Sequence, residues 1–236
     1  MLIKNKKYFS IGVLLTFGFF GLFMLIITPV FDGRNGLQFA DDTFNKLAKG
    51  SSYFVPKVEK HNEKFMGKQF SVTIKYDKLE DARRTAQLFT TSGAKVEQQE
   101  GTLKIEGDLG KTLAAVIKDS DSMYKNEGEQ VKSIYGYDEK RVMKDWWQSL
   151  NKLIKALQAN KKFEEAEMAA EINKKVVEAG YNFYKIDAVK VSEKAVTMTG
   201  LLVFYVLYTI WWGFAIYYLF EGIGLTAKKA KVKKEV

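Results

Sequence analysis

The chain has 236 residues, of which 47% are hydrophobic and 28% charged, with no cysteine and a single histidine. This composition excludes disulfides, thiolate nucleophiles, iron–sulfur clusters and any multi-histidine metal or haem site within one chain, so no cofactor is expected. The formal charge is +9, and its excess lies partly at the ends, with three lysines in residues 1–7 and five lysines against two glutamates in residues 221–236.

Two uncharged apolar segments lie beside these basic ends, a pattern typical of membrane orientation that argues against a nucleic-acid partner. The first, residues 8–31, is 24 residues long. A helix of that length covers about 36 Å, and a bilayer core is about 30 Å thick. Because the apolar part is too long for a signal peptide and no small-x-small cleavage site follows, we predict an uncleaved transmembrane helix.

The segment after this helix opens with a short element of its own. Apolar residues recur at helical spacing over residues 37–49, and Gly50 follows, which predicts a short amphipathic helix ending there. Pro56 predicts a break in the stretch that continues to Lys68, and no regular element is assigned to that stretch.

Alternating and helical patterns are clearer further along the chain. Strict alternation predicts a half-buried strand over residues 69–76, which contains Phe70, Val72, Ile74 and Tyr76. A helix is predicted over 78–92, followed by a hairpin of strands at 94–99 and 102–106. Asp108 is expected to cap a second helix whose inward face carries Leu113, Val116, Ile117 and Met123.

The order strand, helix, strand, strand, helix is that of a ferredoxin-like α+β sandwich without its last strand. We expect a late fourth strand from Tyr184 to Val191; the alternative is a helix over 182–195 continuous with the second apolar segment. Residues 130–180 then form an insertion, predicted to be an antiparallel helical hairpin. The fold class expected is an α+β membrane protein in which two transmembrane helices flank residues 32–195.

The second apolar segment has 26 uncharged residues, Ala195 to Phe220, and we predict a transmembrane helix over 196–220. The basic tails, residues 1–7 and 221–236, are expected in the cytoplasm. This orientation places residues 32–195 outside, in the periplasm of a cell with an inner membrane. Lysines within that long loop do not oppose its translocation.

Aromatic residues are unusually dense in the second apolar segment. From Phe204 to Phe220, nine of seventeen residues are aromatic, and buried phenol and indole groups need hydrogen-bond partners that lipid does not supply. Thr209 and Gly213 form a small-xxx-small pair where another helix can approach closely. The residues expected to dock a partner helix are Tyr205, Tyr208, Thr209, Trp212 and Gly213. Packing of the two spans on each other, and a quinone or lipid site, are the alternatives.

A pair of adjacent tryptophans, Trp146 and Trp147, is the second candidate docking site. A helix cannot bury two consecutive rings on one narrow stripe, so one ring is expected in the core. The other is then available to a partner or to the membrane interface.

Three further motifs are expected to be structural. The glycines at 107 and 110 are too close for a phosphate loop, which requires four intervening residues, so a turn and helix cap is expected. Asp119 and Asp121 lack the glycine and distant glutamate of a calcium loop and are expected on a solvated face. His61 lies in a polar stretch and is expected to be a surface residue.

These features favour a non-catalytic accessory or scaffold subunit of a membrane complex. Its outside domain would bind a partner, and its aromatic second span would dock on a larger membrane subunit in contact with lipid. A homo-oligomer is an alternative assembly. The alternative functions are a membrane sensor with a cytoplasmic partner, which the short tails disfavour, and an extracytoplasmic enzyme using paired carboxylates.

Overall fold

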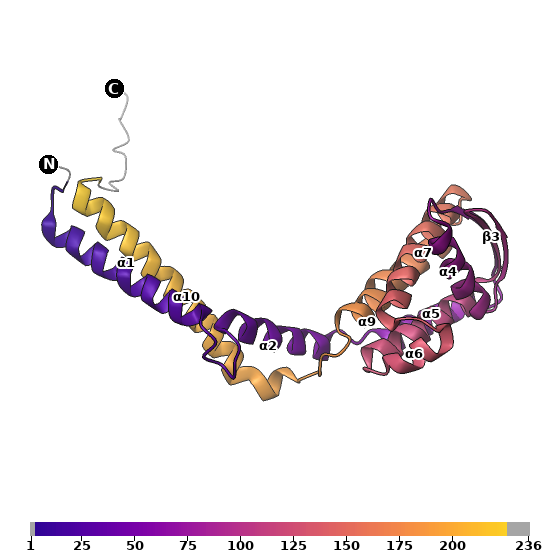
Figure 1. Ribbon diagram of the computed structural model, residues 1–236, viewed down its shortest axis with the longest axis horizontal. Helices are drawn as coiled ribbons and strands as arrows, with labels where there is room; N and C mark the ends of the chain where they lie inside the picture. Colours follow the sequence, from indigo (N-terminus) through magenta and orange to yellow (C-terminus); the bar gives the residue numbers. More distant parts are fainter. Residues whose placement is uncertain (1–2, 226–236) are drawn as a thin grey trace, which may run out of the picture. The chain divides into compact units, whose positions relative to one another are not determined.

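The computed structural model describes residues 3–225 and shows a mostly helical chain, 72% helix, with a three-stranded antiparallel sheet. The chain divides into two compact units (Figure 1). One unit contains the residues up to Phe44 and those from Lys190 onward, and the other comprises Asn45–Val189. The predicted basic tails fall partly on residues 1–2 and 226–236, which lie outside the described residues.

Two long helices, α1 (Lys6–Ile27) and α10 (Val191–Ile223), make up most of the first unit. Both are long and apolar enough to cross a membrane by length and composition, which supports the predicted membrane character. Helix α1 ends earlier than predicted because Thr28 is extended, the conformation that a residue before proline prefers. Helix α10 begins five residues before the predicted span and ends at a left-handed Gly224.

Close packing joins α1 to α10 through glycines. A Cβ atom added at Gly12 would lie 2.6 Å from the backbone nitrogen of Leu219, and one added at Gly222 would lie 2.7 Å from the Cα atom of Phe9. Side chains at these positions would therefore force the helices apart, which is the role small residues play in membrane helix pairs.

Helix α2 (Gly36–Ser51) starts with a reciprocal cap between Asn35 and Gln38. The Gln38 backbone N–H donates to Asn35 Oδ1 at 2.8 Å, and the Asn35 N–H donates to Gln38 Oε1 at 3.0 Å, so two otherwise unpaired donors are satisfied. Pro56 does not break the following stretch. It lies in the first turn of helix α3 (Val55–Asn62), where a proline loses no helical hydrogen bond.

The sheet contains β1 (Gln69–Lys75), β2 (Lys95–Gln99) and β3 (Thr102–Asp108) in the order β1-β3-β2. All neighbours are antiparallel, and β1 alternates exposed and buried residues as predicted. Helix α4 (Leu79–Thr91) and helix α5 (Leu109–Tyr124) complete the predicted order. The helices lie on one side of this sheet (Figure 1).

The predicted fourth strand is wrong, because residues 186–190 have no regular structure and α10 begins only at Val191. The helical alternative for 182–195 is also wrong over most of its first half. Side chains instead cover the outer edge of β1. Lys152 Nζ donates to the carbonyl of Lys75 at 2.8 Å, and Lys162 Nζ donates to that of Gln69 at 2.9 Å. These donors satisfy carbonyls that a fourth strand would have paired.

The predicted helical hairpin is present, together with a π-helical turn and a separate helix that were not predicted. It consists of α7 (Glu139–Ala159) and α8 (Phe163–Ile172), which continues through a π-helical turn (Asn173–Val177) into α9 (Glu178–Asn182). A separate helix, α6 (Gly128–Tyr135), precedes it. Because no described strand follows, the hairpin is the second half of the domain and not an insertion into a sheet.

The predicted hairpin ended at residue 180. In the structure Gly180 does not end a helix but lies inside α9. A Cβ atom there would lie 2.7 Å from the carbonyl oxygen of Ser120. The glycine therefore allows α9 to pack closely on α5. The core that these helices share with the sheet is centred on fully buried side chains that include Phe89, Leu113 and Trp146.

Candidate functional site

The two adjacent tryptophans point into different environments. Trp146 is fully buried, and its ring packs edge-on against Phe89 with centroids 5.6 Å apart. Trp147 is 42% exposed, and its indole N–H donates to Glu178 Oε1 at 3.1 Å. Of the two predicted docking residues, only Trp147 is therefore accessible to a partner.

A buried carboxylate holds Trp146 in place. Asp119 is 5% exposed, and its Oδ2 accepts hydrogen bonds from Trp146 Nε1 at 2.9 Å and from the Tyr135 hydroxyl at 2.6 Å. Burial raises the pKa of the Asp119 carboxyl, and the two hydrogen bonds act in the opposite direction. These contacts join α5, α6 and α7 at one point.

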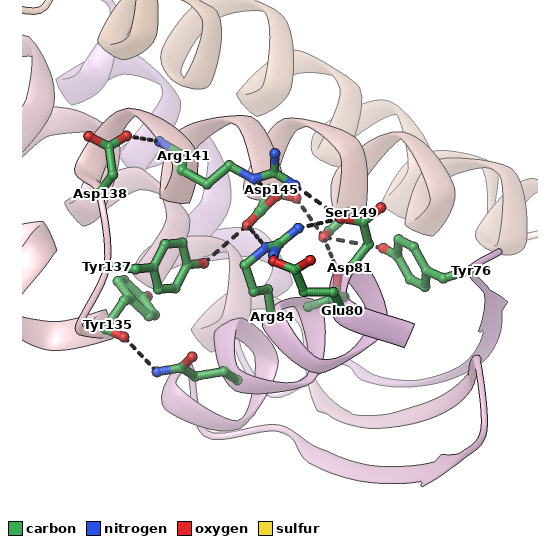
Figure 2. A network of polar contacts seen from close by, with 12 residues as sticks. Tyr76, Glu80, Asp81, Arg84, Tyr135, Tyr137, Asp138, Arg141, Asp145 and Ser149 are labelled. Carbon is green, nitrogen blue, oxygen red and sulfur yellow. Dashed lines mark hydrogen bonds and ion pairs between the residues drawn. The ribbon is translucent and has the colours of Figure 1, made fainter. Parts of the chain in front are cut away.

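A network of charged groups fixes α7 against α4 (Figure 2). Asp145, which is 3% exposed, accepts hydrogen bonds from Arg84 Nε at 2.8 Å and from Arg141 Nε at 2.9 Å. Asp81 binds the same two guanidinium groups, and Glu80 also pairs with Arg84. The two arginines therefore bridge carboxylates from both helices, which restricts α7 to one position on α4.

Neutral hydroxyl groups extend the network toward the sheet. Ser149 donates to the backbone carbonyl of Asp145 at 2.6 Å and accepts from the Tyr76 hydroxyl at 3.3 Å. Burial is the largest cause that raises the pKa of Asp145, and the two guanidinium groups oppose it. Each carboxylate is already paired with arginine. We therefore interpret the network as structural, since it stabilises the packing of α7, the helix that carries Trp147.

Two hollows lie on either side of Trp147. An open cleft of about 550 Å³ has a mixed lining that includes Lys78, Lys152 and Lys155 together with Asp77 and Asp81. An apolar groove of about 330 Å³ between α7 and α9 is lined by residues that include Met143, Val177 and Tyr181. Trp147 borders both hollows, so this exposed ring belongs to a charged cleft and to an apolar groove.

A buried lysine joins the two ends of the domain. Lys49 is 4% exposed, and its ammonium group donates to Asn126 Oδ1 at 3.0 Å and to the carbonyls of Phe183 at 3.1 Å and Ile186 at 2.6 Å. Burial lowers the pKa of Lys49. Three oxygen acceptors match the three ammonium donors. We call these residues the Lys49 junction, a feature that its polar sequence context did not indicate.

The predicted docking residues of α10 divide between two faces. Tyr208 stacks on Phe19 with ring centroids 4.2 Å apart, and Trp212 lies 4.6 Å from the same ring. Trp211, which was not among the predicted docking residues, donates from its indole N–H to the carbonyl of Leu15 at 3.0 Å. These aromatic side chains pack the two helices on each other, as the alternative interpretation expected.

The other docking residues face away from α1. Tyr205 is 67% exposed, and a Cβ atom added at Gly213 would have no described atom within 4 Å. Thr209 is exposed, and its hydroxyl donates to the carbonyl of Tyr205 one turn earlier at 2.7 Å. Tyr205, Thr209 and Gly213 recur every four residues, so they form one open face of α10, which we call the Gly213 face.

None of the three motifs expected to be structural forms a ligand site, but Asp119 was expected on a solvated face and is instead buried. Asp108 caps α5 by accepting from the Lys111 N–H at 3.1 Å, and Gly110 lies against the backbone of Met66, which leaves no room for a phosphate. His61 does have a partner that its sequence context did not reveal, since its Nδ1 lies 2.7 Å from Glu171 Oε2. Within residues 3–225, no group of three or more acidic or histidine side chains is arranged to hold a metal ion.

Comparison of the chain with protein-family models, with curated proteins and with solved structures finds no match.

Proposed function

We propose that this chain is a non-catalytic accessory subunit of a membrane complex. In this proposal α1 and α10 span the inner membrane, both chain ends are cytoplasmic, and residues 32–195 lie outside. The helices dock on a larger membrane subunit, and the outside domain binds a partner. The observation that carries the proposal is the Gly213 face, which remains open while the opposite face of α10 is packed on α1.

The chemistry of the Gly213 face suits another helix better than lipid. The Tyr205 phenol is exposed, and a hydroxyl group surrounded by hydrocarbon lacks hydrogen-bond partners. Gly213 offers backbone surface that lipid chains fill poorly and a helix can approach closely. A second membrane helix would satisfy both groups at once.

The experiment is purification of the tagged full chain from its native membrane in mild detergent, with the co-purifying chains identified and counted. Gly213→Leu should remove the partner from the purified material, because the added side chain blocks close helix approach. Gly200→Leu on the same helix and Gly21→Leu on α1 are matched controls, since all three positions have open space around them. Equal loss of the partner in all three variants, or a wild-type chain recovered alone, contradicts the proposal.

The orientation has its own test. A reporter enzyme that is active only in the cytoplasm should be active when it is fused after Val236. A reporter that is active only after export should be active when it is inserted at Asn126. The opposite result would reverse the topology and with it the assignment of residues 32–195 to the periplasm.

A membrane sensor is the second candidate, and the Lys49 junction is the observation that favours it. The junction bonds the segment where the chain enters the domain to the segment where it leaves. A change inside the domain would therefore reach both connections together. Recovery of a signalling protein on the cytoplasmic side of the complex, in place of a larger membrane subunit, would favour this function.

A further inference from the structure

The exposed face of α7 carries one aromatic side chain in a row of polar and basic ones. Lys140, Lys144, Trp147, Asn151 and Lys155 are three or four residues apart, so they lie on one face of the helix. The row spans about 22 Å at 1.5 Å per residue. All but the half-buried Asn151 are exposed. We call this row the α7 ridge.

The middle of the ridge has the features of a binding anchor. Trp147 lies between the cleft and the apolar groove, and an exposed tryptophan beside a groove is the residue type that most often carries binding energy at interfaces. The groove, about 330 Å³, is large enough for one large apolar side chain. Its wall includes Val177, which ends the π-helical turn, a local geometry frequent at functional sites.

The ends of the ridge define the charge of its partner. Neither Lys140, Lys144 nor Lys155 forms an ion pair with a carboxylate in the described part of the chain. The cleft that contains Lys155 adds Lys78 and Lys152, and of its two carboxylates, Asp77 and Asp81, the second is paired with Arg84 and Arg141. The aromatic anchor is therefore flanked by positive charge in both directions along the helix, which selects an acidic partner.

The network beneath the ridge makes it a rigid platform. Two charged contacts join α7 to α4: Asp145 binds Arg84 at 2.8 Å, and Arg141 binds Asp81 at 3.0 Å (Figure 2). A surface that is already ordered loses little conformational entropy when a partner binds.

We propose that the α7 ridge binds an acidic segment of a partner protein, and that one large apolar side chain of this segment enters the groove beside Trp147. The inference rests on the proposed function and adds the chemistry that the partner must present to the outside domain. Carboxylates of the segment lie over the lysines on both sides of the anchor.

A photo-crosslinking amino acid at Gln148 tests this inference in the full chain within its native membrane. Gln148 lines the cleft next to Trp147 but does not belong to the ridge, so the anchor and the lysines stay intact. The expected adduct is a peptide of another protein that is net negative and carries a large apolar residue near the crosslink.

Charge-matched variants show whether the ridge selects that peptide. The triple change Lys140→Gln, Lys144→Gln and Lys155→Gln should lower the adduct yield at least about threefold, since exposed ion pairs each contribute a small factor. The control changes three exposed lysines of the same domain, which are Lys57, Lys60 and Lys111. Both variants lose the same charge, and only the first should lose the adduct.

Other results overturn the inference. These are an adduct with a second copy of this chain, an adduct with a glycan, an adduct with a basic or neutral peptide, equal loss in both triple variants, or no adduct. The outcome is separable from the test of the proposed function. A complex that is lost on Gly213→Leu but gives no adduct at Gln148 refutes the ridge alone, whereas a chain that purifies without partners refutes the accessory-subunit proposal.

Discussion

Replacing each of the two adjacent tryptophans by phenylalanine gives a sharp test of how the domain is held together. The two changes are chemically identical and one residue apart, yet Trp146 is fully buried and Trp147 is 42% exposed. Trp146→Phe keeps an aromatic ring in the core but removes the indole N–H that binds Asp119. Trp147→Phe removes only a bond to Glu178 at the surface.

The expected difference follows from these contacts. Loss of a hydrogen bond to a buried carboxylate costs about 1.5–3 kcal/mol, and the volume left by the smaller ring adds about 1–2 kcal/mol. Trp146→Phe should therefore lower the free energy of unfolding by about 2.5–5 kcal/mol. The change at Trp147 should cost less than about 1 kcal/mol, because its side chain is only partly buried and its bond lies near water.

The assay is urea denaturation of the full chain in neutral detergent micelles, followed by far-ultraviolet circular dichroism, with wild type and both variants measured at the same pH. The domain transition of the Trp146→Phe protein should move to a clearly lower urea concentration, while that of Trp147→Phe should stay near wild type. Midpoints that fall equally in the two variants would refute the assignment of Trp146 to the core and of Trp147 to the surface.

Three further variants test separate features of the domain by the same denaturation assay. Burial raises the folded-state pKa of Asp119, so the wild type loses stability as pH rises through that pKa, and the stability of Asp119→Asn relative to wild type should increase as pH rises above about 4, the ordinary value for aspartate; a constant difference would contradict this. Gly180→Ala should cost about 1–3 kcal/mol, because the added methyl group would lie 2.7 Å from the Ser120 carbonyl, and an unchanged midpoint would show that α9 and α5 can separate freely. Lys49→Met should lower stability by about 2–4 kcal/mol through the loss of its charged hydrogen bonds, whereas Lys57→Met at an exposed position should change it by less than about 0.5 kcal/mol, and equal effects would place Lys49 outside the core.

Local patterns were sufficient to predict the elements from β1 to α5, although helix α3 before them was missed. Alternation along 69–75 and the turn at Glu100-Gly101 specify β1 and the hairpin, and Asp108 caps α5 as expected. In each case the residues that define the element are close in sequence. The hydrophobic periodicity and the helix caps can therefore be recognised directly from the sequence. The hairpin of α7 and α8 was predicted for the same reason.

The prediction of a fourth strand was wrong because the conformation of this segment depends on residues that are far away in the sequence. The partly alternating residues after Tyr184 resemble a strand, but Lys152 and Lys162 already cover the edge of β1 where it would pair. The carbonyls of Phe183 and Ile186 bind Lys49 instead. None of these three lysines has a local pattern that reveals its contacts, since a lysine reads as a solvated residue in sequence. Only the fold shows that Lys49 is buried and that Lys152 and Lys162 bind the edge of β1.

The sequence was sufficient to predict which residues belong to the candidate site but not which way each side chain faces. Adjacency alone indicated that Trp146 and Trp147 must diverge, and contacts across the core decide that Trp146 is the buried one. In α10, aromatic density indicated contact with another helix. In the structure Tyr208 and Trp212 pack on α1, whereas Tyr205 and Gly213 stay open. This division depends on which face of α10 is packed against α1.

The Lys49 junction also makes the domain a self-contained module. The Val189 backbone N–H donates to the carbonyl of Lys46 at 3.2 Å, so the chain enters and leaves residues 45–189 at neighbouring points. Domains with adjacent ends are those that tolerate insertion into other chains and circular permutation. We therefore expect that residues 45–189 can be exchanged for a short loop, or transplanted between two other helices, if the last turns of α2, which crosses the boundary at Asn45, are rebuilt. Such exchanges would allow the contributions of the two units to be separated genetically.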